Sequence, residues 1–168
     1  MLIIITGPES SGKTTLATAL SNHYKGTLIH EYSREYLHNL NKPYSLQDLH
    51  QIASQQYNSI LKALSDNSKH HFVDTDWINV SIWAELKFGT SKEEFEKYTL
   101  LPDLYLICCP DLPWEFDPLR ENPHELELLF LLHYQKVLES KTAYCLIQGV
   151  GTKRINQAIN AIESHRIS

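Results

Sequence analysis

The chain has 168 residues, of which 42% are hydrophobic and 21% charged, and its formal net charge is -5. This length suits one domain with a buried core, so we predict a single domain over residues 1–168 and leave its oligomeric state open. No apolar stretch approaches the ~20 residues of a membrane helix, and an acidic chain without a lysine or arginine cluster is a poor binder of nucleic acid. Membrane proteins and nucleic-acid-binding proteins are therefore disfavoured.

The N-terminal apolar stretch and the cysteines both bear on the cellular compartment. The stretch is too short for a secretory signal and has no basic leader, so we expect a cytoplasmic protein. The three cysteines, Cys108, Cys109 and Cys145, lie in apolar, strand-like segments. We interpret them as packing residues and not as a disulfide or zinc framework.

Strand and helix patterns alternate along the chain. Five apolar stretches are predicted to be strands: residues 2–6, 27–30, 70–76, 103–109 and 143–149. Stretches with helical spacing are predicted to be helices: residues 14–24, 33–40, 45–64, 77–88, 91–98, 124–140 and 154–165. The third of these helices begins with a Ser45–Asp48 capping box. Such alternation predicts an α/β fold, with a five-stranded parallel sheet covered by helices on both faces.

The segment GPESSGKT, between the first strand and the first helix, matches the phosphate-binding pattern G-x-x-x-x-G-K-[ST]. Its amide N–H groups and the start of the helix can surround phosphate, which predicts a P-loop NTPase. Lys13 is expected to reach the terminal phosphates, and Thr14 to bind Mg²⁺. ATP is favoured over GTP because no N-K-x-D motif occurs. The predicted nucleotide contacts are Gly7, Glu9, Ser10, Ser11, Gly12, Lys13, Thr14, Thr15 and Arg154.

Acidic residues follow the second and third strands, at the sheet edge where open α/β proteins bind ligands. Residues two apart in a strand share a side, so Asp74 is predicted to be a metal ligand and catalytic acid, and Asp76 an acceptor contact. Asp76 could instead only cap the next helix. Glu31 is predicted to be a base or sugar contact and Arg34 a phosphate contact, with a surface ion pair between them as the alternative.

The segment PDLPWEFDPLRENP, residues 110–123, has four prolines and is predicted to be a lid loop over this edge. A flat ring could stack on Trp114 or Phe116, Asp117 could bind sugar hydroxyls, and Arg120 could neutralise the transferring phosphate. A packed structural loop is the alternative. The chain has only four arginines, which favours an acceptor without a phosphate group of its own.

Several of these stretches, among them GPESSGKTTLA, HEYSREYL, VDTDW, PWEFDPLR and IQGVGTKRINQAI, together resemble the ribosylnicotinamide kinase domain of the bacterial NAD-salvage regulator family and its stand-alone relatives. The resemblance implies a nucleoside-kinase-like P-loop fold and phosphorylation of nicotinamide riboside by ATP, with magnesium. It implies riboside contacts from Glu31, Trp114 and Asp117, and adenine near residues 149–154.

Larger members of the family carry an adenylyltransferase domain, and some a helix-turn-helix, ahead of the kinase. The printed sequence starts at the P-loop strand, so we expect from it neither DNA binding nor the second salvage step. Two other functions stay open: a kinase for another nucleoside or nucleotide, and an ATP-gated binding module.

Overall fold

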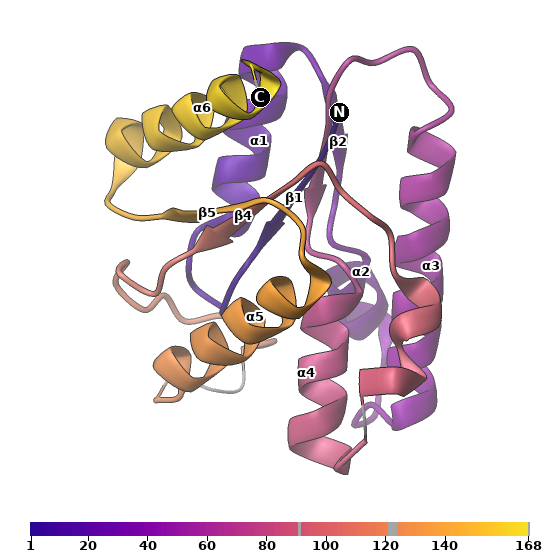
Figure 1. Cartoon of the computed structure of the whole chain (residues 1–168). Helices are drawn as coiled ribbons and strands as arrows, with labels where there is room; N and C mark the ends of the chain where they lie inside the picture. Colours follow the sequence, from indigo (N-terminus) through magenta and orange to yellow (C-terminus); the bar gives the residue numbers. More distant parts are fainter. Residues whose placement is uncertain (91, 121–123, 168) are drawn as a thin grey trace.

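The computed structural model describes residues 1–90, 92–120 and 124–167 (Figure 1). Residue 91, with which one predicted helix begins, and residues 121–123, the end of the predicted lid, lie outside the described residues. None of the helices in the described part of the chain combines the length and the apolar character needed to cross a membrane.

A parallel sheet forms the centre of the molecule. Its five strands are β1 (Leu2–Thr6), β2 (Thr27–Ile29), β3 (His71–Asp74), β4 (Leu104–Cys108) and β5 (Tyr144–Ile147). They lie in the order β2-β3-β1-β4-β5, and every neighbouring pair is parallel. Because β1 pairs with β3 on one side and β4 on the other, the chain order reverses at β1, and a crevice opens beyond the carboxyl ends of these strands. The predicted fold class is confirmed.

Helices cover both faces of the sheet (Figure 1). On one face lie α1 (Lys13–Tyr24) and α6 (Gly151–Ile167), and on the other α3 (Leu46–Ala63), α4 (Trp77–Phe88) and α5 (Leu126–Ser140), while the short α2 (Tyr32–Asn39) follows β2. Alternate residues of β1 serve the two faces: Ile3 and Ile5 pack with α1 and α6, whereas Leu2 and Ile4 pack with α3, α4 and α5. Both faces are therefore tied to one central strand.

The long helix α3 begins as predicted. Ser45 is its N-cap, its Oγ accepts a hydrogen bond from the Asp48 amide at 3.3 Å, and Asp48 Oδ2 accepts one from the Ser45 amide at 2.7 Å. The capping box is confirmed. The Asp48 carboxylate accepts hydrogen bonds from the Ser45 hydroxyl, the Tyr36 hydroxyl and the Ser45 amide, and these bonds lower its pKa to about 2.

The helix predicted over residues 91–98 is wrong. The described part of this segment forms two short 3-10 helices, η1 (Lys92–Glu94) and η2 (Glu96–Tyr98), with Phe95 between them. Phe95 is completely buried and its ring stacks on His50 of α3, with 4.4 Å between the ring centroids. Docking this ring onto α3 interrupts the helical path, a tertiary contact that helical spacing alone does not reveal.

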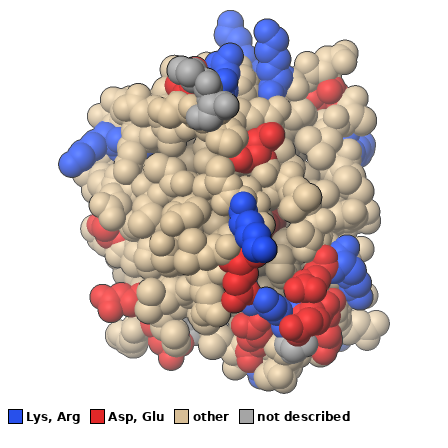
Figure 2. Space-filling model, in the orientation of Figure 1, with Lys and Arg blue, Asp and Glu red and all other residues tan. Residues whose placement is uncertain are grey.

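The surface carries charge of both signs. Figure 2 shows lysine and arginine side chains spread over one face, with acidic side chains gathered toward the lower right of the view beside several basic ones. Of the free cysteines, Cys108 and Cys109 are buried at the end of β4 and Cys145 is partly buried, and burial raises the pKa of the Cys108 thiol to about 11.

Candidate nucleotide and acceptor site

The P-loop turns sharply between β1 and α1. Gly7 and Gly12 have φ angles of 133° and 76°, in the region that favours glycine. A Cβ atom on Gly7 would lie 2.5 Å from the carbonyl oxygen of Cys108, and one on Gly12 would lie 2.8 Å from Leu112 Cδ1. The close approach of the β4 backbone therefore requires glycine at position 7, and the positive φ angle favours glycine at position 12.

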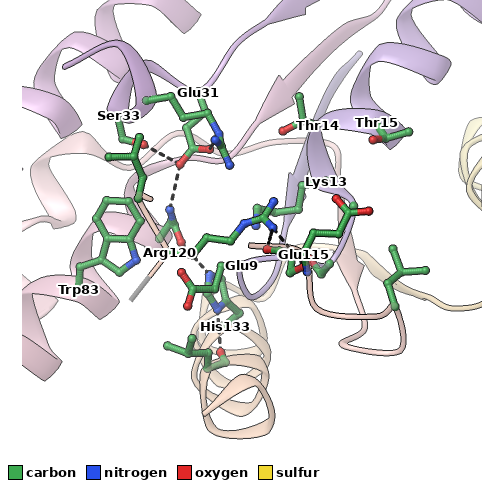
Figure 3. A pocket seen from close by; sticks show the side chains of 18 of the residues that line it. Glu9, Lys13, Thr14, Thr15, Glu31, Ser33, Trp83, Glu115, Arg120 and His133 are labelled. Carbon is green, nitrogen blue, oxygen red and sulfur yellow. Dashed lines mark hydrogen bonds and ion pairs between the residues drawn. The ribbon is translucent and has the colours of Figure 1, made fainter. Parts of the chain in front are cut away.

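The loop opens into a cavity of about 240 Å³ at the carboxyl edge of the sheet (Figure 3). The Lys13 ammonium lies over the loop and donates a hydrogen bond to the Pro8 carbonyl at 2.8 Å. Among the predicted site residues, the cavity is lined by Glu9, Ser10, Ser11, Gly12, Lys13, Thr14, Thr15, Glu31, Arg34 and Arg120. The structure thus brings the P-loop, the end of β2 and the lid loop around one space.

Asp74 and Thr14 form a pair beside this space that fits a magnesium ion. Asp74 Oδ2 accepts a hydrogen bond from the Thr14 hydroxyl at 2.6 Å, while the buried Oδ1 has no hydrogen-bond partner among the described residues. Burial, and then the nearby Glu31 carboxylate, raise the pKa of Asp74. A hydroxyl and a carboxylate with a spare oxygen are ligands that Mg²⁺ prefers.

Glu31 and Arg34 lie at the N-terminal end of α2 and face the cavity (Figure 3 labels Glu31). Glu31 accepts a hydrogen bond from the Ser33 hydroxyl at 2.6 Å, and its other oxygen lies 3.4 Å from Arg34 Nε. Arg34 Nη1 also donates to Asp117 of the lid loop at 2.7 Å. The Glu31–Arg34 ion pair considered from the sequence is present, and the separate Arg34–Asp117 pair joins α2 to the lid.

The predicted lid lies against the P-loop. Arg120 lines the cavity and donates hydrogen bonds to the Glu115 carbonyl and to the Ser10 hydroxyl, the latter at 3.3 Å. The Glu115 amide donates to the same Ser10 hydroxyl at 3.0 Å. Arg120 also lies over the Trp114 ring, 5.7 Å from its centroid.

The aromatic residues predicted to stack on a ligand lie elsewhere. Neither Trp114 nor Phe116 is among the described residues that line the cavity, and the Phe116 side chain is 87% exposed. The Trp114 ring instead packs under the guanidinium of Arg120. Asp117 likewise does not line the cavity, because its carboxylate is bonded to Arg34. The aromatic wall comes from Trp83 of α4 (Figure 3).

Asp76 is also placed differently from the prediction. Thr75 has a φ of 66°, which ends the strand alternation, so Asp74 and Asp76 do not share a side. Asp76 is 3% exposed, caps α4 through the Ile78 amide at 3.2 Å, and accepts a hydrogen bond from the Tyr105 hydroxyl at 2.7 Å. Burial raises its pKa to about 6. The capping role considered as the alternative is the one present.

Arg154 supports the P-loop from behind. It is 4% exposed and donates hydrogen bonds to the carbonyl groups of Ser11, Cys109 and Gly149, and to Asp111 Oδ1, at 2.7 to 3.1 Å. Arg154 does not line the cavity and its bonds in the structure are structural ones, while the nucleotide contact predicted for it stays a prediction.

The lining residues that the sequence did not single out include Asn79 and Trp83 of α4, and His133 of α5. Asn79 and Trp83 are four residues apart on the helix that follows the Asp74 strand, and this spacing was a usable signal. His133 sits in the apolar run LLFLLHY, where a lone histidine suggests core packing. It is 1% exposed, and burial lowers its pKa to about 3.

Comparison with known proteins supports this reading of the fold. Residues 2–154 match the family model described as "AAA domain". The trifunctional NAD biosynthesis/regulator protein NadR of Escherichia coli (strain K12) is 31% identical over 127 residues, which cover 70% of this chain and 30% of that protein. The chain therefore spans less than a third of the length of this curated relative in the match.

Solved structures show the same fold. A structure of NadR in complex with NR has a TM-score of 0.85 at 21% identity, over 98% of this chain and 50% of that one. A structure of NadR in complex with NAD and AMP-PNP has a TM-score of 0.77 at 23% identity, over 99% of this chain and 49% of that one. A structure of deoxyadenosine kinase from M. mycoides has a TM-score of 0.71 at 13% identity, over 98% of this chain and 100% of that one. The chain belongs to the AAA domain family and is similar to NadR in both sequence and fold.

Proposed function

We propose that the protein is an ATP-dependent kinase that phosphorylates nicotinamide riboside to nicotinamide mononucleotide. The observation that carries the proposal is the single cavity that joins the P-loop to Glu31 and Trp83, so that a nucleotide and an acceptor would meet in one space. The similarity to NadR, whose solved structures include complexes with NR and with the ATP analogue AMP-PNP, supports this choice of substrates.

The chemistry of the acceptor wall agrees with a cationic ring. Nicotinamide riboside carries a positively charged pyridinium, which the face of an indole attracts. Trp83 offers such a face, and the carboxylates of Glu9 and Glu31 line the same cavity. The ribose hydroxyl that receives phosphate would lie near Glu31, within reach of a base.

The residues present account for the parts of phosphoryl transfer. The P-loop amides and Lys13 would hold the β- and γ-phosphates, and Arg120 would neutralise charge that develops on the transferred group. A magnesium ion held by Thr14 and Asp74 would supply further charge neutralisation at the phosphates. Glu31 would orient the attacking hydroxyl and accept its proton. Positioning and electrostatics carry most of such a reaction.

The test is ADP release from magnesium-ATP in the presence of single acceptors: nicotinamide riboside, deoxyadenosine, other nucleosides and a nucleoside monophosphate. Stimulation by nicotinamide riboside with formation of the mononucleotide supports the proposal. Stimulation by another nucleoside alone would reassign the acceptor, and slow hydrolysis that no acceptor stimulates would favour an ATP-gated binding module.

Matched variants locate the acceptor. Trp83→Ala removes the aromatic wall and is expected to raise KM for the riboside by about tenfold, since stacking on an aromatic ring contributes about 1–3 kcal/mol. Trp114→Ala alters an indole outside the cavity and serves as the control, with a smaller effect. Equal effects, or the larger one in Trp114→Ala, would return the acceptor site to the lid.

A further inference from the structure

A chain of three side chains from three helical elements crosses the cavity wall. Nε2 of His133, on α5, lies 3.3 Å from Oδ1 of Asn79, on α4, and Nδ2 of Asn79 lies 3.5 Å from Oε1 of Glu31, the N-cap of α2. Dashed lines in Figure 3 connect the labelled His133 and Glu31 to the side chain between them. Asn79 and His133 have no part in the mechanism given above.

The ring of His133 has one proton, and its place is fixed. Nδ1 lies 2.7 Å from the carbonyl oxygen of Leu129, one turn earlier on α5, and a carbonyl only accepts, so Nδ1 carries the hydrogen. Burial, and then the charges of Lys13 and Lys136, hold the pKa of the imidazole near 3, so the ring is neutral. Nε2 therefore has a lone pair and cannot donate to Asn79.

This proton count leaves one contact unsatisfied. With neutral His133 and a Glu31 carboxylate, the Asn79 amide can donate to one neighbour, but its carbonyl oxygen then faces an acceptor on the other side. A proton on Glu31 removes the conflict once the Asn79 amide is turned over from the orientation given above, so that Oδ1 faces Glu31 and Nδ2 faces His133. The Glu31 O–H then donates to Asn79 Oδ1, and the Asn79 N–H donates to His133 Nε2. Two hydrogen-bond acceptors that face each other in a buried site repel, so a proton on Glu31 stabilises the hydrogen-bond network.

We propose that His133 and Asn79 are positioning residues that favour transfer of the acceptor hydroxyl proton to Glu31, an inference that rests on the kinase function proposed above. In this step the acceptor O–H bond breaks and the proton passes to a Glu31 oxygen. The electron pair left on the acceptor oxygen forms the bond to the γ-phosphorus of ATP. The bond from that phosphorus to the β–γ bridging oxygen breaks, and its electron pair leaves with ADP.

Of the other groups near Glu31, the like charge of the Asp74 carboxylate acts in the same sense, and two groups act in the opposite sense. The Ser33 hydroxyl and the Arg34 guanidinium, at 2.6 and 3.4 Å, both stabilise the carboxylate. These two groups favour the carboxylate in the resting site, whereas the Asn79–His133 pair favours the protonated form. Glu31 can serve as a base only if both forms are accessible, and the two sets of neighbours supply that balance.

The main variant is His133→Gln, whose amide can donate as well as accept and so satisfies Asn79 without a proton on Glu31. We expect kcat to fall about tenfold or more, with KM for ATP and for the acceptor within about twofold of wild type. The matched control is His50→Gln on α3, where the imidazole stacks on Phe95 away from the cavity. It should leave kcat unchanged.

Asn79→Leu interrupts the network at its centre with a side chain of similar size. If the two residues act as one unit, Asn79→Leu and the double variant with His133→Gln should lose the same factor in kcat as His133→Gln alone. Additive losses, or unchanged kcat in His133→Gln, would overturn the proposal. Thermal melting of each variant separates these effects from loss of folding.

A measurement without turnover completes the test. Nitrogen NMR of histidine-labelled protein reports the protonation of each ring nitrogen, and we expect His133 to be neutral with hydrogen on Nδ1 near neutral pH. A doubly protonated ring would satisfy Asn79 without Glu31 and would refute the inference. If wild type phosphorylates no acceptor, the kinase function fails instead, and the NMR result still decides the state of the network.

Discussion

Burial lowers the pKa of the His133 imidazole, in the cavity wall, far below its usual value. It is 1% exposed, next to the positive charges of Lys13 and Lys136, and its pKa is about 3. An unfolded histidine has a pKa of about 6.5. Protons therefore bind the unfolded chain more readily than the folded one between these two values, and acid favours unfolding there.

This difference predicts how stability depends on pH. The contribution of His133 is fully present above about pH 6.5 and is lost as the pH falls toward the folded pKa, by about 2–3 kcal/mol at about pH 4.5. His133→Gln has no such group, so the stability gap between wild type and variant should narrow by that amount on acidification. Urea unfolding at the two pH values measures it. Parallel pH curves for the two proteins would contradict the neutral ring.

Single residues differ in how readily their roles can be predicted from sequence. Gly7, Gly12 and Lys13 were predictable because phosphate binding fixes both their types and their spacing. The positions of Asp76 and Trp114 were not, since they depend on the left-handed turn at Thr75 and on the packing of Arg120 over the indole. Such orientations depend on contacts between segments far apart in the sequence.

At the scale of elements, α6 is joined to the P-loop through one buried arginine. Arg154 lies in the first turn of α6 and bonds the carbonyls of Ser11, Cys109 and Gly149, while its ion pair with Asp111 lies at 2.7 Å. The planar guanidinium can reach these groups at once because its donors point in several directions. Loop, strand end and helix are thus held by a single side chain.

Arg154→Lys should therefore loosen the P-loop. A lysine ammonium cannot span the same carbonyls, so we expect the free energy of unfolding to fall by about 2–4 kcal/mol and KM for ATP to rise. Arg166→Lys, on the same helix, is the control, because the Arg166 side chain is 51% exposed and its pair with Glu163 contributes below about 1 kcal/mol. Chemical denaturation and ATP titration of both variants test this, and equal losses would refute the structural role of Arg154.

Element boundaries followed from the sequence wherever local signals agreed with packing. Helix α4 spans residues 77–88 as predicted, with Asp76 before it and Gly89 after it at a φ of 65°. The helix prediction for residues 91–98 failed because Phe95 packs in the core against α3, and no local sequence pattern encodes that contact. The loop over residues 110–120 was recognised from its prolines, whereas its contacts with Ser10 and Arg34 needed the folded chain.

For the whole molecule, the central strand β1 couples the two core layers and the nucleotide site. Its alternate side chains enter both hydrophobic clusters, and its last residue, Thr6, leads directly into the P-loop. Neither layer can lose its packing without exposing one side of β1. We therefore propose that residues 1–168 unfold as one cooperative unit, with the phosphate site as part of that unit.

Nucleotide binding should then stabilise the entire domain. At about 100 times its dissociation constant, a ligand that binds only the folded state adds about 2.7 kcal/mol to the free energy of unfolding. Magnesium-ATP is expected to shift one transition, seen alike by circular dichroism of the helices and by the fluorescence of the three tryptophans, two of which, Trp77 and Trp83, lie on α4. Lys13→Met removes the cation of the P-loop and should abolish most of the shift. Two separate transitions would contradict the single unit, whereas an equal shift in Lys13→Met would place the nucleotide away from the P-loop.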